Sequence, residues 1–447
     1  MHSHRVLQVY LPIILLAFLI GYTIRHHSPS TTAMPSKLSP QEVASALLAE
    51  KDLDVLSLSL LQSLWAGYGQ ICRVTASPKQ ASANTLESGA EGSTPKDSVM
   101  STPKDTHSYI LKLISPPSSS RSDEGHIRKI LSYQIEQYFY TQLAPQLPAS
   151  IPVAKCLASI NKQRPDGGST TAMILSDLAQ DYPVAGEKRA ALTDRQALSA
   201  LDWLSNFHGF WWSRVDDLND SELVLPPLEQ IKRGNTSKKS IWLNGGYTYL
   251  ATRQSEYQNL IHDSDSEWSE ALTQTISTHS QSIAELVALF LAPSTSTATP
   301  IERYQTLIHG DVKSENLFTT TAGDQVAFYD FQYVGLGLGV CDLAKFFTCS
   351  VPLEMLVLDE DVPGVLAMDE GERVLLERYW KNLKEVGGRE YEWETFVRHW
   401  EIALVDWLRF QASWGFWGNT EWLEARVRSI LRDEAWREFL MDATARA

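Results

Sequence analysis

Alternating apolar and polar positions mark the first third of the chain and predict a series of strands. The alternation begins near Val55, and the run Ser63–Val74 predicts a strand, a glycine turn and a second strand. Further strands are predicted at His107–Ile114, in the stretch Ile151–Ala158 and at Ala172–Leu178. This part of the chain is therefore expected to form a sheet.

Helical periodicity follows between and after these strands. Ile127–Ala144 and Thr193–Trp212 both repeat apolar residues at helical spacing. A shorter helix is predicted to begin at Pro40, with Ser39 as its N-cap. Its expected buried face consists of Val43, Ala46 and Leu47. The last hundred residues are helical in pattern and rich in aromatic side chains, most of which we expect in the core.

Two segments depart from the pattern of a folded core. Residues 6–24 are almost uninterruptedly apolar, which predicts an uncleaved transmembrane anchor, with a cleaved signal peptide as the alternative. Residues 25–50 are then a Ser/Thr/Pro-rich tether followed by the leading helix. Residues 77–106 are polar and poor in aromatic residues, so we expect a disordered insertion between two strands.

Composition excludes some classes of protein. The 447 residues are 43% hydrophobic and 21% charged, which is typical of a globular chain long enough for two lobes. A formal charge of −15 argues against a nucleic-acid partner held by electrostatics. The four cysteines lack metal-ligand spacing, and free thiols are favoured over a disulfide framework.

The most informative stretch for chemistry lies between Thr306 and Phe347. Asp311 is followed five residues later by Asn316, and a hairpin-like pattern then leads to Asp330 at the end of an apolar run. Phosphoryl transfer needs a carboxylate for the attacking hydroxyl and oxygen ligands for magnesium. We therefore interpret Asp311 as the base and Asn316 with Asp330 as metal ligands. Lys313 is placed to neutralise charge on the transferred group.

These residues carry a resemblance to a known family. HGDVKSEN followed by YDFQ resembles the catalytic and metal-binding loops of the aminoglycoside/choline kinase-like phosphotransferases, which include the ecdysteroid kinase-like proteins. Relative to the protein-kinase motifs, Gly310 replaces the usual Arg and Gln332 the usual Gly. Asp342 matches a recurrent aspartate of the family that is expected to brace the catalytic loop. The resemblance implies an α+β, two-lobed protein-kinase-like fold.

The same resemblance assigns expected roles in a smaller N-terminal lobe at residues 51–178. This lobe would contain an antiparallel sheet and one main helix. The turn at Gly67 and Gly69 would fold over the ATP phosphates, although it lacks the third glycine of GxGxxG. Lys112 matches the ATP-binding lysine, and Glu136 matches the helical glutamate that pairs with it.

The hinge and the larger, mostly helical lobe at residues 179–447 follow from the same comparison. Adenine would bind at the hinge, mainly through backbone groups of Ser176, Asp177 and Leu178, where Ser176 departs from the family's usual Glu. His208 is expected to be a structural core histidine. Trp242–Arg253 and Glu401–Phe416 are candidate walls of an acceptor pocket, where an acidic residue such as Asp406 would suit a cationic acceptor unless it is simply solvated.

The sequence thus predicts a membrane-tethered enzyme, with its catalytic part expected in the cytosol. It would use ATP and Mg²⁺ to phosphorylate a hydroxyl group of a small molecule. A catalytically weak nucleotide-binding scaffold is the alternative from another class. A protein kinase is less favoured, because the short segment from Asp330 to Asp342 leaves little room for an activation loop.

Overall fold

The protein is described here by a computed structural model. It describes residues 39–445, with gaps at residues 65–66, 80–104, 117–122, 164–168, 219–222, 234–239, 277–279, 294–300 and 360. The predicted anchor at residues 6–24 lies outside the described residues, as does most of the predicted insertion. Within the described part, no helix combines the length and the apolar character needed to cross a bilayer.

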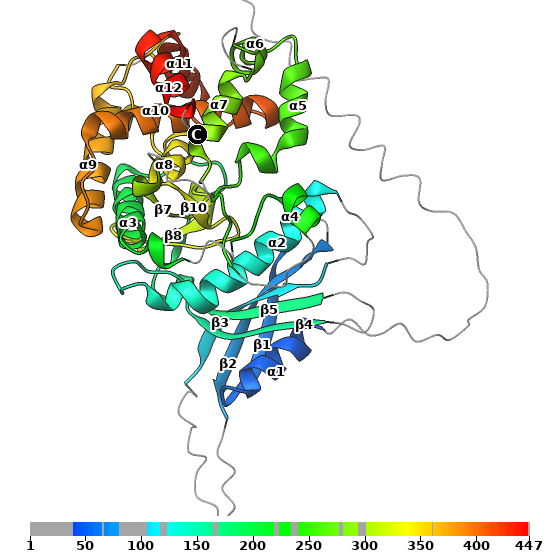
Figure 1. The fold of residues 1–447 in the computed structure, drawn as a ribbon. Helices are drawn as coiled ribbons and strands as arrows, with labels where there is room; N and C mark the ends of the chain where they lie inside the picture. Colours follow the sequence, from blue (N-terminus) through cyan, green and yellow to red (C-terminus); the bar gives the residue numbers. More distant parts are fainter. Residues whose placement is uncertain are drawn as a thin grey trace, which may run out of the picture. The chain divides into compact units, whose positions relative to one another are not determined.

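The N-terminal lobe is built on a five-stranded sheet in which every neighbouring pair is antiparallel (Figure 1). The strand order is β1-β2-β3-β5-β4. Its strands are β1 (Leu53–Ser63), β2 (Gly69–Pro78), β3 (His107–Ile114), β4 (Cys156–Gln163) and β5 (Ser169–Ser176). The alternating pattern in the sequence therefore identified each strand of this sheet.

Two predicted boundaries were wrong. The polar insertion does not begin at residue 77, because β2 continues to Pro78, which pairs with Leu53 of β1. The strand predicted from Ile151 begins only at Cys156. Before it, Val153 forms a single isolated bridge to Phe328. In both places tertiary pairing, rather than local composition, decides where the strand lies.

Helices lie on both sides of this sheet (Figure 1). On one side is α1 (Pro40–Ala49), which begins with the predicted Ser39 cap and a capping box to Glu42. It buries Val43, Ala44, Leu47 and Leu48, so the prediction that Ala46 belongs to the buried face was wrong. On the other side is α2 (Glu124–Tyr138), whose last turn continues as a π-helix at Phe139–Leu143.

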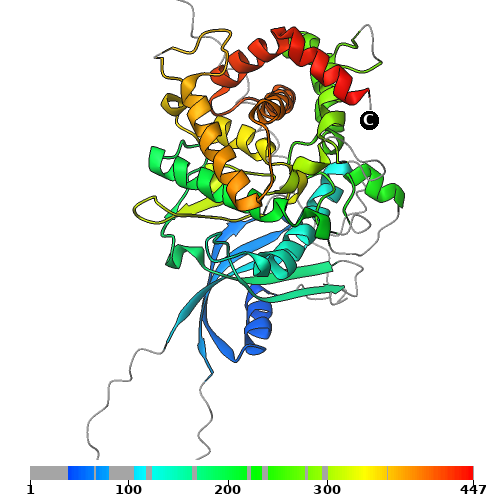
Figure 2. The same ribbon diagram turned by 60° about the vertical axis from the view of Figure 1, so that its left-hand side comes forward.

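The C-terminal lobe is mostly helical, and Figure 2 shows its orange-to-red helices gathered away from the blue N-terminal strands. Its helices are α3 (Asp194–Trp212), α4 (Pro227–Arg233), α5 (Gln254–His262), α6 (Glu267–Thr273), α7 (Ile283–Leu291), α8 (Gly339–Cys349), α9 (Glu370–Gly387), α10 (Trp393–Trp414), α11 (Thr420–Arg432) and α12 (Glu434–Thr444). The predicted aromatic core is present, but Trp414 and Phe416 are exposed. The α+β, two-lobed fold class is confirmed.

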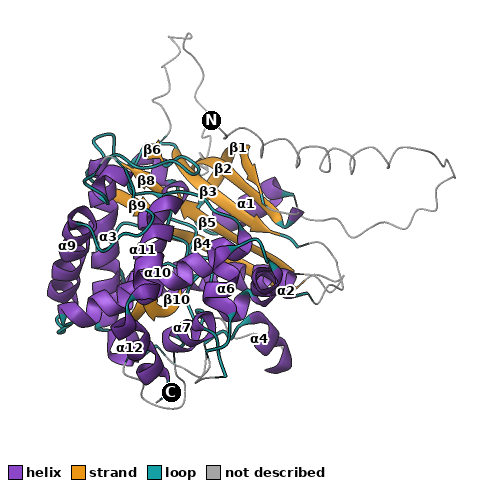
Figure 3. Ribbon diagram, turned by 90° about the horizontal axis from the view of Figure 1, so that it is seen from above, coloured by secondary structure: helices purple, strands orange, loops and turns teal. Residues whose placement is uncertain are grey.

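Two small sheets in this lobe carry the segment that the sequence singled out. β7 (Gln305–Ile308) pairs with β10 (Gly335–Leu338), and a second sheet contains β6 (Val184–Ala185), β8 (Leu317–Thr319) and β9 (Val326–Phe328). The predicted hairpin is therefore β8–β9. Figure 3 shows β6, β8 and β9 beside α3, at the side of the large sheet.

Phe331 joins the two lobes next to this segment. Its fully buried ring stacks on Phe139 at the end of α2, with ring centroids 3.8 Å apart. Its ring also lies near those of Phe207 on α3 and His309 before the candidate base. Close packing around Phe331 therefore fixes the end of α2, α3 and the loop of His309 relative to one another, and this positions the candidate site.

We expect Phe331→Ala to lower the free energy of unfolding by about 3–5 kcal/mol, because it leaves a cavity between elements that cannot easily collapse. Urea denaturation measures this loss. Phe396→Ala, which empties an equally buried position of the C-terminal lobe, is the matched control and should cost a similar amount. A loss below about 1 kcal/mol at Phe331 would show that the joint is not rigid.

Candidate active site

A buried carboxylate on α8 holds the loop that carries the candidate base. Asp342 accepts hydrogen bonds from two consecutive backbone N–H groups, those of His309 (2.7 Å) and Gly310 (2.9 Å). His208 Nε2 lies 3.2 Å from the same carboxylate. The predicted bracing contact of Asp342 is therefore present in the structure. His208 is fully buried and also contacts Tyr379, as expected of a core histidine.

Charge around Asp342 keeps it ionised. Burial raises the pKa of this carboxyl, but the hydrogen bond and charge of His208, together with Lys345, more than offset that effect and lower it below its usual range. Lys345 also donates a 2.6 Å hydrogen bond to the carbonyl of Gly310. The backbone N–H and C=O groups of Gly310 are thus both bound by side chains of α8.

His309 supports the loop as a neutral ring. Its Nε2 lies 2.9 Å from the carbonyl of Tyr329, while its Nδ1 lies 3.2 Å from the backbone N–H of Asp311. The first contact requires a proton on Nε2 and the second requires Nδ1 without one. Burial lowers the pKa of His309, which agrees with a neutral ring.

Gly310 explains one departure from the protein-kinase motif. Its φ is +84°, and a Cβ atom added there would lie 2.2 Å from the carbonyl oxygen of Tyr333 and 2.8 Å from the N atom of Gly246. Neither the backbone conformation nor the space permits a side chain. The usual arginine of this motif therefore cannot fit in this chain.

Asp311 and Asn316 lie together, as the spacing predicted. Asn316 Nδ2 donates to the backbone carbonyl of Asp311 (2.8 Å) and to its carboxylate (3.1 Å). Lys313 Nζ lies 3.2 Å from the same carboxylate and 3.6 Å from that of Glu315. Burial lowers the pKa of Lys313, but the two carboxylates have the larger, opposite effect. The net result is a raised pKa, so the lysine is charged.

Asp330 meets the N-terminal lobe through Lys112. Lys112 Nζ lies 2.7 Å from the Glu136 carboxylate and 3.0 Å from Asp330 Oδ1, so the predicted Lys112–Glu136 ion pair is present. Although burial raises the pKa of Asp330, the adjacent Lys112 lowers it below the usual range. Asp330 has a φ of +65°, a conformation that is uncommon away from glycine.

The donor atoms left over suit magnesium. Among the described residues, Asn316 forms hydrogen bonds only through its amide nitrogen and Asp330 only through Oδ1, so Asn316 Oδ1 and Asp330 Oδ2 have no partner there. The described residues contain no group of three His, Cys, Asp or Glu side chains arranged for a metal. Mg²⁺ is commonly held by one or two protein oxygens together with phosphates and water, so the residues present fit it.

The glycine turn lies between β1 and β2, as predicted. Gly67 has a φ of +74° and Gly69 a φ of +154°, and a Cβ atom at Gly69 would lie 1.9 Å from the carbonyl oxygen of Leu113. The buried Tyr68 between them packs on Tyr133 of α2. The turn therefore needs its glycines, whereas its role over the phosphates stays a prediction.

The hinge side chains face the protein. Asp177 accepts hydrogen bonds from Arg73 of β2 (2.8 Å) and Ser108 of β3 (2.6 Å). The Ser176 hydroxyl accepts one from the backbone N–H of Lys155. Leu178 begins a short 3₁₀ turn. Sequence reasoning missed the Arg73 and Ser108 contacts. Because the Asp177 and Ser176 side chains are engaged within the protein, binding of adenine by the hinge backbone stays a prediction.

The charge available in the candidate acceptor walls differs from the prediction, which left Asp406 either facing a cationic acceptor or solvated. Asp406 is neither solvated nor free, because it is buried and pairs with Arg409 at 2.6 Å. In the segment 242–253, the N–H of Tyr247 donates to the carbonyl of Gly310 at 2.9 Å, so this segment contacts the catalytic loop. Arg253 stacks on the Tyr247 ring and pairs with Glu256.

Comparison with known families agrees with this geometry. A sequence model of the ecdysteroid kinase-like family matches residues 96–362, which is more than half of the chain. The chain therefore belongs to the ecdysteroid kinase-like family, and the resemblance seen in the sequence is confirmed. A search of curated proteins found no match.

Solved structures that resemble this one are kinases and phosphotransferases of small molecules. An ethanolamine kinase from Plasmodium vivax shares 13% identity over 87% of this chain and 84% of its own, with a TM-score of 0.38. A macrolide 2′-phosphotransferase from Brachybacterium faecium shares 13% over 90% and 98%, with a TM-score of 0.36. A choline kinase from Cryptosporidium parvum Iowa II shares 11% over 89% and 88%, with a TM-score of 0.36. The family assignment rests on the family match.

Gly310→Ala tests the packing of the catalytic loop. We expect it to cost more than about 2 kcal/mol of unfolding free energy, because it combines backbone strain with the collision at Tyr333. Gly388→Ala is the matched control, since Gly388 has a φ of +61° and open space around it. Chemical denaturation should show the larger loss at Gly310. Equal losses would mean that the loop moves to admit a Cβ atom.

Protonation of His309 should oppose folding. Because its pKa is lowered in the folded state, the unfolded chain binds the proton first, and His309 lowers stability as pH falls below about 6.5. Ring ¹⁵N shifts in a histidine-labelled sample should show a neutral ring with the proton on Nε2 at pH 6. A doubly protonated ring at that pH would contradict the contacts assigned to it.

Proposed function

We propose that this protein transfers the γ-phosphoryl group of ATP to a hydroxyl group of a small molecule. The observation that carries the proposal is that the catalytic loop and the loop of Asp330 are joined: Asn316 contacts the Asp311 carboxylate, and its backbone carbonyl accepts a 2.9 Å hydrogen bond from the N–H of Tyr329. Tyr329 directly precedes Asp330, which is bound by Lys112. These groups come from segments far apart in the sequence, namely β3, the loop after β7 and the loop after β9. Belonging to the ecdysteroid kinase-like family supports the same reaction class.

In this proposal Asp311 acts on the acceptor. Its carboxylate takes the hydroxyl proton as the acceptor oxygen forms a bond to the γ-phosphorus and the bond to the ADP oxygen breaks. Asn316 and Lys313 both contact this carboxylate and hold its orientation. The charged Lys313 also lies where it can neutralise the transferred group.

The remaining groups act on ATP. Lys112 would contact the phosphates while Glu136 fixes its position. Asn316 Oδ1 and Asp330 Oδ2 would hold magnesium, which neutralises phosphate charge when bound. The hinge backbone near Ser176–Leu178 would receive adenine.

The acceptor walls bear on the choice of small molecule. The acidic side chains of these walls, Asp406 and Glu401, already pair with Arg409 and Arg398, respectively. Neither carboxylate therefore offers free negative charge to a cationic acceptor. We propose a neutral or anionic hydroxyl compound as the better class of acceptor.

Acceptor-dependent ADP release by the full-length protein tests the reaction. With Mg²⁺ and a library of alcohols, we expect turnover that Asp311→Asn lowers roughly 10²- to 10⁴-fold, because the general base is lost. Asp330→Asn and chelation of Mg²⁺ should abolish it. Asp324→Asn, in the exposed turn of the β8–β9 hairpin, is the matched control and should retain it.

The same assay separates the enzyme from a nucleotide-binding scaffold. A scaffold would bind Mg·ATP without turnover on any acceptor class and would tolerate Asp311→Asn. Phosphorylation of proteins but of no small molecule would favour a protein kinase instead. Residues 331–341, however, form a turn, β10 and the start of α8, where a protein kinase has its activation loop.

A further inference from the structure

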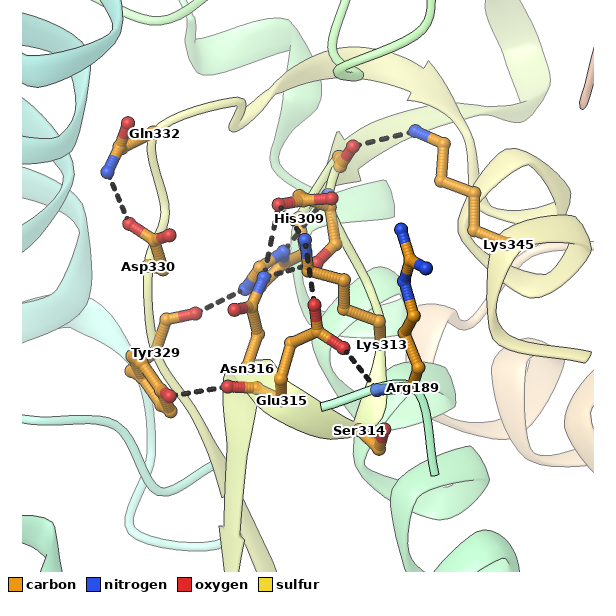
Figure 4. A network of polar contacts seen from close by, with 12 residues as sticks. Arg189, His309, Lys313, Ser314, Glu315, Asn316, Tyr329, Asp330, Gln332 and Lys345 are labelled. Carbon is orange, nitrogen blue, oxygen red and sulfur yellow. Dashed lines mark hydrogen bonds and ion pairs between the residues drawn. The ribbon is translucent and has the colours of Figure 1, made fainter. Parts of the chain in front are cut away.

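The side chain of Gln332 makes two contacts that the glycine of the protein-kinase motif could not make. Its side-chain Nε2 donates a 2.5 Å hydrogen bond to Asp330 Oδ1 (Figure 4). Its Oε1 lies 3.3 Å from the hydroxyl of Ser132 on α2, whose single proton is shared with the carbonyl of Lys129 at 2.9 Å. Its backbone carbonyl accepts a 3.0 Å hydrogen bond from Trp242 Nε1. The side chain is thus held at both ends of its amide.

The contact with Asp330 determines which carboxylate oxygen is free. Oδ1 receives both Lys112 Nζ and Gln332 Nε2, so rotation of the carboxylate would break two hydrogen bonds. Oδ2 has no hydrogen bond to any described residue, and it is the oxygen assigned above to magnesium. Groups that orient a metal ligand in this way commonly change metal affinity when they are removed.

Ser132 places this contact within a larger pattern on α2. Arg128, Ser132 and Glu136 are four residues apart and therefore share one face of the helix. Arg128 donates to the carbonyl of Thr252 in the C-terminal lobe, and Glu136 pairs with Lys112, which contacts Asp330. Ser132 lies between them and reaches the metal-binding loop through Gln332. The central contact of this face therefore depends on Gln332.

We infer that Gln332 is a positioning residue that orients Asp330 for the metal and ties this ligand to α2 through Ser132. The inference rests on the proposed function, because it concerns the magnesium site of that reaction. Gln332 touches neither the acceptor nor a phosphate in this account. Its effect is expected on metal binding first and on turnover as a consequence.

The affinity for Mn²⁺ in the presence of ADP tests this role without turnover, with electron paramagnetic resonance used to count free Mn²⁺. We expect Gln332→Met, which keeps the shape but loses the amide, to weaken binding roughly 10- to 100-fold. Ser132→Ala should weaken it by a smaller factor. The double variant should bind no more weakly than Gln332→Met alone, because both changes act through one contact.

Gln196→Met is the matched control. Gln196 also uses both ends of its amide, accepting from Thr193 and donating to Thr319, but it lies on α3 away from the metal ligands. We expect it to lower unfolding free energy while leaving Mn²⁺ affinity within about twofold of the wild type.

Three results would overturn the inference. Unchanged Mn²⁺ affinity in both Gln332→Met and Ser132→Ala would show that neither residue orients Asp330. Equal weakening by Gln196→Met would show a general loss of stability. If Gln332→Met does not fold, the Mn²⁺ affinity of Ser132→Ala alone decides whether the inference holds. Failure of the wild-type protein to bind Mn²⁺ with ADP would overturn the proposed function as well, which distinguishes the two failures.

Discussion

The buried carboxylate of Asp342 is the contact on which the catalytic loop depends. It receives the N–H groups of His309 and Gly310, which a buried loop would otherwise leave unpaired. Both N–H groups converge on this one carboxylate, and Gly310 then continues the loop with a positive φ that other residues rarely adopt. An unpaired buried N–H costs about 1–3 kcal/mol, so this one side chain determines the path of the backbone just before Asp311.

The position of Asp330 depends in turn on the same loop and on the N-terminal lobe. His309 contacts the carbonyl of Tyr329, the residue before Asp330, and Phe331 after it packs on Phe139. Asp330 is thus held by hydrogen bonds from Lys112 and Gln332 and by packing on both sides in the sequence. Together these contacts leave one side-chain oxygen each of Asn316 and Asp330 without a hydrogen bond to any described residue, and these two oxygens are the proposed magnesium ligands. Such preorganisation is what phosphoryl transfer requires of the protein.

The sequence predicted these residues for a chemical reason. Asp311, Asn316 and Asp330 have side chains that the reaction needs, at a spacing that a loop and a hairpin can bring together. The Lys112–Glu136 pair could be predicted from the family resemblance alone. By contrast, the partners of Asp177 on β2 and β3, and the pairing of Asp406 with Arg409, depend on packing that no local pattern encodes. For that reason the sequence did not show that the acidic charge of the candidate acceptor wall is paired within the protein.

Other features were visible in the sequence but could not be explained there. Gly310 and Gln332 stood out only as departures from a motif. The structure gives the reasons, since Tyr333 excludes a side chain at Gly310 and Ser132, 200 residues away in the chain, meets Gln332. The strand ends near Pro78 and Cys156 were misplaced because pairing with the neighbouring strand of the sheet decided them.

Anomalous diffraction from a crystal of the protein with Mn²⁺ and a non-hydrolysable ATP analogue would test the central claim most directly. We expect a manganese peak bound by Asn316 Oδ1 and Asp330 Oδ2, the two oxygens proposed as ligands of magnesium. The γ-phosphate should point toward Asp311. A metal peak bound by other residues, or a nucleotide whose γ-phosphate faces away from Asp311, would contradict it.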